Sequence, residues 1–124
     1  MQSPEATGKS YGAKHFASAF KYSISGLRHA LREAAFRQEL ALAALHAVAL
    51  AILRPRMAAA LVLSALLGVV LVAELLNTAI EAVVDLASPG RNALAGKAKD
   101  LGSAAVFVSL VLFGCAWTAV LVWR

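Results

Sequence analysis

Apolar and basic residues recur with a helical period over residues 14–37. The apolar positions follow one another at steps of three and four and share one helix face, and basic residues form a second stripe. This pattern predicts an amphipathic helix on a membrane surface, with its basic side chains near the headgroups. The alternative is a helix that packs on a partner protein. The two stripes are Phe16, Phe20, Ile24, Leu27, Leu31 and Lys14, Lys21, Arg28, Arg32.

Three longer apolar runs follow this segment. A helix needs roughly 20 residues to cross a membrane, and the polar letters "FRQE" extend the first run to that length. Pro55 disfavours continuation of that run, and Pro89 with Gly90 predicts a loop between the second and third. The sequence therefore predicts an all-α membrane protein, with three transmembrane helices and an N-terminal surface helix. The predicted spans cover residues 38–53, 57–87 and 100–123.

Composition agrees with this pattern. The 124 residues are 60% hydrophobic, and the mean hydropathy of +0.72 is too high for an ordinary soluble domain. Residues 1–13 are polar, without an apolar period, and predict a mobile tail ahead of a single membrane domain over residues 14–124. The net charge of +5 comes from basic residues beside the apolar segments, which favours anionic headgroups as partners and not nucleic acid.

The distribution of basic residues predicts the orientation of the chain. Nine of the twelve lie before the first span or between the second and third, which is one side of the membrane in a three-span protein. Because cytoplasmic loops carry an excess of Lys and Arg, that side is expected to be the cytoplasm. The sequence thus predicts a multi-pass membrane protein with a cytoplasmic N-terminus.

A polar stripe interrupts the second apolar run in the stretch "AELLNTAIEAVVDLA", residues 73–87. At 100° per residue, Glu74, Asn77, Glu81 and Asp85 fall within about 100° of one another and share a helix face. Glu74 is expected about one turn inside the apolar zone of the membrane, and Glu81 and Asp85 are expected to emerge from that zone. Carboxylates that cross an interface in this way suit a reaction between a lipid-borne group and a water-borne one.

Other polar side chains are expected near the same membrane level. Lys99 and Asp100 start the third span; their alternative interpretation is an interfacial anchor and a helix N-cap. His46, alone in an apolar run, is interpreted as a hydrogen-bonded structural residue and not a metal ligand. The end of the surface helix and the start of the first span contribute Glu33, Arg37, Gln38 and Glu39; Glu33 with Arg37 also fits a simple surface pair.

Three segments resemble the signature segments of the prokaryotic diacylglycerol kinases. They are "EAAFRQE" (33–39), "AELLNTAIEAVVD" (73–85) and "AGKAKDLGSAAV" (95–106), in matching order and spacing, and the likeness covers residues 19–124. The resemblance implies a homotrimer of three-span subunits with shared active sites and no P-loop. It also implies transfer of the ATP γ-phosphate to the primary hydroxyl of diacylglycerol, giving phosphatidic acid, with Mg²⁺ as cofactor.

Residue roles carry over from the family by motif position. The resemblance implies that Glu74 is the general base, and that Glu33 and Glu81 bind Mg²⁺. One departure is Asn92, which stands where close family members are expected to have His; Lys14 and His15 compete for a basic nucleotide contact. The remaining implied roles are orientation of nucleotide and substrate by Asn77, Lys99 and Asp100, support of the nucleotide site by Asp85, a nucleotide-side aromatic at Tyr22, and substrate contacts from Arg37, Gln38 and Ser103.

Two other functions remain open from the sequence. Undecaprenol kinases share nearly the same motifs, although "KDLGSAAV" with Ser103 is more similar to the diacylglycerol enzymes. A small oligomeric transporter or channel would instead use Glu74 as an intramembrane ligand. The long basic surface helix and the letters "KAKD" argue against that class.

Overall fold

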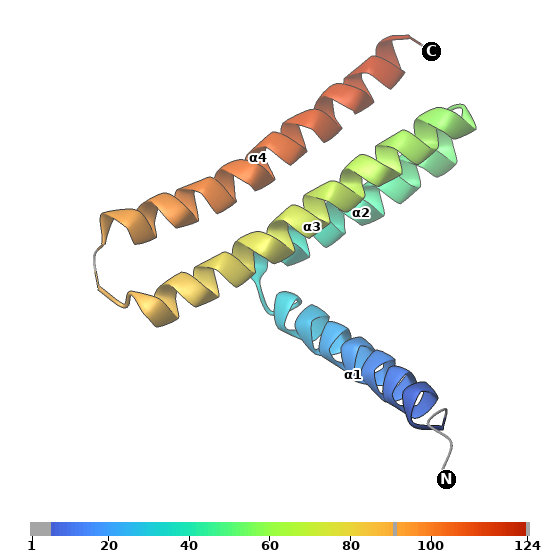
Figure 1. The fold of residues 1–124 in the computed structure, drawn as a ribbon. Coiled ribbons are helices and arrows are strands. Elements are labelled where there is room, and N and C mark those ends of the chain that lie inside the picture. Colours follow the sequence, from blue (N-terminus) through green and yellow to red (C-terminus); the bar gives the residue numbers. More distant parts are fainter. Residues whose placement is uncertain (1–5, 91, 124) are drawn as a thin grey trace. The chain divides into compact units, whose positions relative to one another are not determined.

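The computed structural model describes residues 6–90 and 92–123. Within these ranges every regular element is an α-helix (Figure 1). The chain forms two compact units, residues 1–33 and residues 34–124. Three helices are long and apolar enough to cross a membrane, which confirms the predicted number of spans. The four helices are α1 (Ala6–Ala30), α2 (Ala34–Leu53), α3 (Met57–Ala87) and α4 (Ala93–Val122).

Helix α1 forms the N-terminal unit and corrects the sequence prediction at both ends. It begins at Ala6, so residues 6–13 are helical and not a tail; residues 1–5 lie outside the described ranges. The helix ends at Ala30 and not at residue 37. The backbone NH of Leu31 makes the last bond four residues back, to Leu27, and Arg32 and Glu33 then bond only three residues back. These tighter bonds close a turn at residues 31–33 that separates α1 from α2.

The second unit is an up-down-up arrangement of α2, α3 and α4, in which α3 packs on both other helices (Figure 1). Its small core contains Leu67 and Val70 of α3 and Phe113 of α4. Leu63 of α3 is fully buried as well. Only 17%, 22% and 11% of the apolar windows of the three helices are buried inside the chain. The remaining apolar surface is what a membrane-embedded subunit presents to lipid or to neighbouring subunits.

The start of α4 is set by Asn92. Its side-chain oxygen accepts hydrogen bonds from the backbone NH groups of Leu94 (2.8 Å) and Ala95 (3.3 Å), which is the N-cap arrangement. The helix therefore begins seven residues before the predicted residue 100, and the loop before it is correspondingly shorter. Asp100 lies within α4 and is not its N-cap. Helix α2 likewise begins earlier than predicted, at Ala34, whereas α3 has the same bounds as the predicted second span.

His46 connects all three helices of this unit. It is buried, with 6% of its surface exposed, and its Nε2 is 3.1 Å from Ser64 Oγ on α3. Its ring makes edge contacts with Phe113 and Trp117 of α4, at centroid distances of 5.5 and 5.6 Å. The interpretation of His46 as a hydrogen-bonded structural residue is confirmed.

Ser64→Ala is expected to lower the free energy of unfolding by about 0.5–1.5 kcal/mol, because it leaves the buried imidazole without its partner across the helices. The measurement is the thermal midpoint in detergent micelles. Thr118→Val is the matched control, since the Thr118 hydroxyl bonds only to the carbonyl of Gly114 in its own helix. Equal midpoints for the two variants would show that the bond between His46 and Ser64 contributes no stability.

Candidate active site

The polar face of α3 changes from buried to exposed along the helix. Glu74 and Asn77 are buried, with 5% and 9% of their surfaces exposed, although they carry polar side chains. Glu81 and Asp85, one and two turns further on, are exposed. A 31-residue helix is roughly 46 Å long, whereas the hydrocarbon core of a membrane is about 30 Å thick. The helix therefore has length to extend beyond the apolar zone and present its last carboxylates to water.

Asn77 is held between Glu81 and α4. Its Nδ2 donates to Glu81 Oε1 at 3.4 Å, and within the described residues its buried Oδ1 has no hydrogen-bond partner. On α4, Gly102 is buried and faces this amide: a Cβ added at Gly102 would lie 2.4 Å from Asn77 Oδ1 and 3.4 Å from Asn77 Cγ. A side chain at Gly102 would thus displace the Asn77 amide.

Glu39 joins this site from α2. It is buried, with 7% of its surface exposed, and its charge interacts with that of Glu74. Its Oε2 has no hydrogen-bond partner among the described residues. Within the described residues, Glu39 Oε2 and Asn77 Oδ1 are thus buried near Glu74 without hydrogen-bond partners, an arrangement that is costly unless protons, cations or substrate groups join them. We call Glu39, Glu74, Asn77 and Glu81 the polar cluster.

An ion pair lies beyond the polar cluster, where α3 ends and α4 begins. Lys99 Nζ contacts Asp85 Oδ1, and the side chains remain 37% and 66% exposed. Because both groups reach water, the pair contributes at most about 1 kcal/mol to stability. Its effect is to hold the Lys99 ammonium at the mouth of a recess of about 590 Å³ under the loop between α3 and α4, with Gly90 and Gly96 in its wall.

A comparison with protein families decides the class of this site. The model described as prokaryotic diacylglycerol kinase matches residues 21–121, which include the polar cluster and the ion pair. The chain belongs to the prokaryotic diacylglycerol kinase family.

Curated members of the family are similar over most of the chain. The diacylglycerol kinase of Haemophilus influenzae is 39% identical over 115 residues, covering 91% of this chain and 97% of that protein. The Pseudomonas aeruginosa diacylglycerol kinase is 43% identical and covers 89% and 90%. The Escherichia coli diacylglycerol kinase is 40% identical and covers 90% and 92%. The chain is thus similar to these kinases over about nine-tenths of its length.

The structure brings only some of the predicted kinase residues together. Glu74, Asn77 and Glu81 lie in the polar cluster, and Lys99 is paired with Asp85. Asp100 is exposed. It lies two residues before Gly102, which places it about 160° around α4 from the side that faces Asn77. Exposed positions in the three-helix unit also include Arg37, Gln38 and Ser103; Tyr22 and Glu33 are exposed in the N-terminal unit.

Two residues of the site had no assigned role in the sequence analysis. Glu39 closes the segment "EAAFRQE" directly before the apolar run of α2, and a carboxylate at the start of a membrane span is the signal that identifies it. Gly102, in "KDLGSAAV", lowers helix propensity inside a long helix, and such a glycine commonly marks a close approach of another chain segment. The structure shows that approach, made by Asn77.

Proposed function

We propose that the protein transfers the γ-phosphate of ATP to the primary hydroxyl of diacylglycerol, giving ADP and phosphatidic acid, and that Glu74 is the general base. The observation that carries the proposal is the burial of Glu74 beside Glu39, inside the motif that matches the kinase family. A carboxylate held at this depth of the helix, within reach of a lipid hydroxyl, is placed to accept the proton of that hydroxyl, as a general base requires.

The chemical step needs little covalent participation by the protein. The lipid hydroxyl gives its proton to the Glu74 carboxylate, and the hydroxyl oxygen forms a bond to the γ-phosphorus. The bond between the γ-phosphorus and the bridging oxygen breaks, and ADP leaves with those electrons. Lys99, held by Asp85, would neutralise phosphate charge, while Asn77 and Asp100 would orient the reactants.

Substrate contacts are assigned to exposed residues around the cluster. Arg37 and Gln38 at the start of α2, and Ser103 on α4, would contact the lipid where it emerges from the apolar zone. Tyr22 of α1 would lie against the nucleotide. The recess under the loop between α3 and α4, about 590 Å³ and bordered by Lys99, would accept part of ATP.

Magnesium fits the oxygen donors of the site. Within the described ranges no group of three His, Cys, Asp or Glu side chains could hold a metal ion. Mg²⁺ at kinase sites, however, is bound by one or two carboxylates together with substrate phosphates and water. Glu81, which is exposed and bonded to Asn77, would be one such ligand, and Glu33 would be the second. When bound, the ion would neutralise charge on the phosphates.

We further propose a homotrimer in which neighbouring subunits share each active site. The exposed Asp100, on the far side of α4 from Asn77, supports this arrangement because it would face a neighbouring chain. The large exposed apolar surface of the three spans supports it as well. The protein would lie in the bacterial inner membrane with its N-terminus and the polar cluster on the cytoplasmic side, as the distribution of basic residues indicates. Helix α1, with the exposed Phe16 and Phe20, would lie on that surface.

The test is transfer of labelled γ-phosphate from ATP by the purified protein in mixed micelles, with diacylglycerol and undecaprenol offered in parallel. Preferential labelling of diacylglycerol, absent in Glu74→Gln, is the expected result. Preference for undecaprenol would keep the mechanism and change the substrate. Labelling of neither lipid by a folded protein would contradict the kinase proposal and favour the transporter alternative.

Glu81→Gln is expected to raise the Mg²⁺ concentration needed for half-maximal activity by about tenfold, because loss of a ligand weakens metal affinity. Activity is measured as Mg²⁺ is titrated at fixed ATP. Asp85→Asn is the comparison variant: it removes an exposed carboxylate one turn further along α3 and frees Lys99 from its ion pair, so it should weaken ATP binding more than it changes the Mg²⁺ requirement. An unchanged Mg²⁺ requirement in Glu81→Gln would exclude Glu81 as a ligand.

A further inference from the structure

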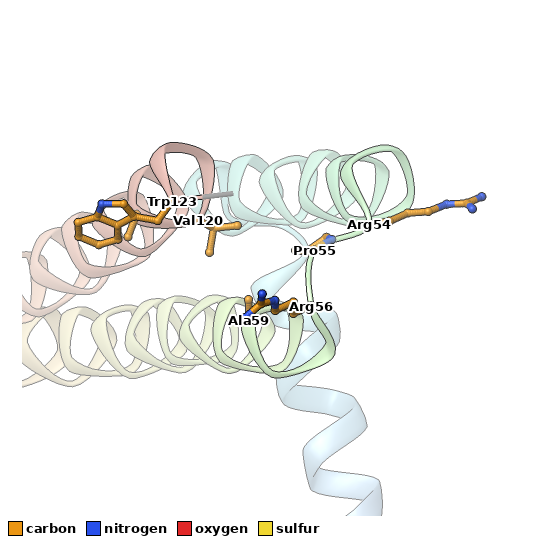
Figure 2. A pocket seen from close by; sticks show the side chains of 7 residues that line it. Arg54, Pro55, Arg56, Ala59, Val120 and Trp123 are labelled. Carbon is orange, nitrogen blue, oxygen red and sulfur yellow. The ribbon is translucent and has the colours of Figure 1, made fainter.

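A second pocket lies at the opposite ends of the spans from the polar cluster. It has a volume of about 470 Å³ and is formed where the turn between α2 and α3 meets the end of α4 (Figure 2). We call it the arginine pocket. Its lining residues are Arg54, Pro55, Arg56, Ala59, Ala119, Val120 and Trp123.

Within the described residues of the three-helix unit, no acidic residue lies near the two arginines. Glu39 is 15 residues from Arg54 along α2 and Glu74 is 18 residues from Arg56 along α3, which correspond to roughly 22 and 27 Å. Arg54 Nε donates to the Ala51 carbonyl at 3.4 Å, a neutral group at the end of α2. In the described part of the chain, this end of the unit therefore carries two positive charges without a counter-charge.

The rest of the pocket is apolar. Ala59 and Ala119 are small and leave space between α3 and α4, while Val120 and Trp123 form the wall on α4. Trp123 is 82% exposed, and Trp side chains are enriched where a membrane span meets water. In Figure 2, Arg56 lies beside Ala59, whereas the Arg54 side chain extends from the same turn away from Val120 and Trp123. The pocket thus has an apolar wall with one guanidinium group, that of Arg56, at its edge.

This combination matches one class of ligand. An acyl chain fits an apolar wall at the level of a membrane, and guanidinium groups bind phosphate oxygens with paired hydrogen bonds. We propose that the arginine pocket binds a membrane phospholipid with an anionic headgroup, its phosphate on Arg56 and an acyl chain against Val120 and Trp123, with the positive charge of Arg54 at the same turn adding to the attraction (Figure 2). The site is separate from the proposed phosphotransfer, since it lies at the other end of the same helices.

Tryptophan fluorescence reports directly on this pocket. The chain has two tryptophans, so Trp117→Phe leaves Trp123 as the only one. The full-length variant is placed in two kinds of phosphatidylcholine bilayer. One contains brominated phosphatidylglycerol and the other contains brominated phosphatidylcholine, and the brominated acyl chains quench the fluorescence of nearby tryptophan. Brominated phosphatidylglycerol is expected to bind at Trp123 at least about fivefold more tightly than brominated phosphatidylcholine. This ratio corresponds to the attraction typical of one basic residue near a membrane surface.

Two double variants separate a built site from general surface attraction. Arg54→Gln with Arg56→Gln is expected to abolish the preference for phosphatidylglycerol. Arg28→Gln with Lys97→Gln removes the same charge from α1 and from the other end of α4, and should preserve the preference. If Trp117→Phe impairs folding, the difference in quenching between the natural sequence and Trp123→Phe gives the same quantity.

Three results would overturn the proposal. The first is equal quenching by the two brominated lipids, and the second is a preference for phosphatidylglycerol that survives in the Arg54 and Arg56 double variant. The third is loss of that preference when inorganic phosphate is added at matched ionic strength. The last would identify a site for free phosphate. Because quenching requires neither ATP nor turnover, these outcomes are independent of the phosphotransfer assay.

Discussion

Glu74→Gln is expected to reduce kcat for lipid phosphorylation by about 10²–10⁴-fold, the usual contribution of a general base. Gln has nearly the same shape as Glu but cannot accept the proton of the lipid hydroxyl. The substitution also removes the charge that interacts with Glu39, so folding and assembly should be preserved or slightly strengthened. The measurement is kcat with both Michaelis constants, together with the thermal midpoint of the same preparation.

Glu74→Asp is the informative companion variant. It keeps a carboxylate but moves it back by one methylene, so activity should lie between those of the natural protein and Glu74→Gln. If Glu74 acted only as a hydrogen-bond acceptor for the lipid, Gln would serve as well as Asp, and the Michaelis constant for the lipid would change more than kcat. Substantial turnover by Glu74→Gln would rule out the assignment as general base.

Gly102→Ala is expected to reduce kcat by about 10²-fold while leaving the thermal midpoint nearly unchanged. The new methyl group would lie 2.4 Å from Asn77 Oδ1 but 3.7 Å from Asn77 Cα, so the amide must rotate while the helices keep their separation. Helix propensity favours Ala over Gly by about 1 kcal/mol, which offsets part of the steric cost. A displacement of about 1 Å in a positioning group is enough for a loss of this size.

Gly114→Ala is the matched control for Gly102→Ala. It adds the same methyl group to α4 at a position where, among the described residues, no atom beyond the neighbouring residues and local helix backbone lies within 4 Å, and should leave activity unchanged. In an Asn77→Ala background, Gly102→Ala should cause no further loss, because the side chain through which it acts is gone. The same loss in both backgrounds would show that Gly102 acts through helix packing instead.

Sequence and structure agree most closely where periodicity and length carry the information. Helix α3 has the bounds expected from its apolar run, and its polar face extends from the buried Glu74 to the exposed Asp85. The errors lie at helix ends. α4 begins early because Asn92 provides the cap, and α1 ends early because three residues form a turn. Caps and turns depend on one or two hydrogen bonds, which leave little trace in an apolar pattern.

The amino-acid sequence by itself determined the class of the protein, the number of spans and the kinase motifs, because apolar run length and motif spacing are local properties. Only the tertiary structure decided which polar groups meet. It brought Glu39 to Glu74, set Asn77 against Gly102, and placed two arginines beside an apolar pocket at the far end of the spans. These contacts join residues from different helices, and such pairings depend on how the helices rotate and slide against one another.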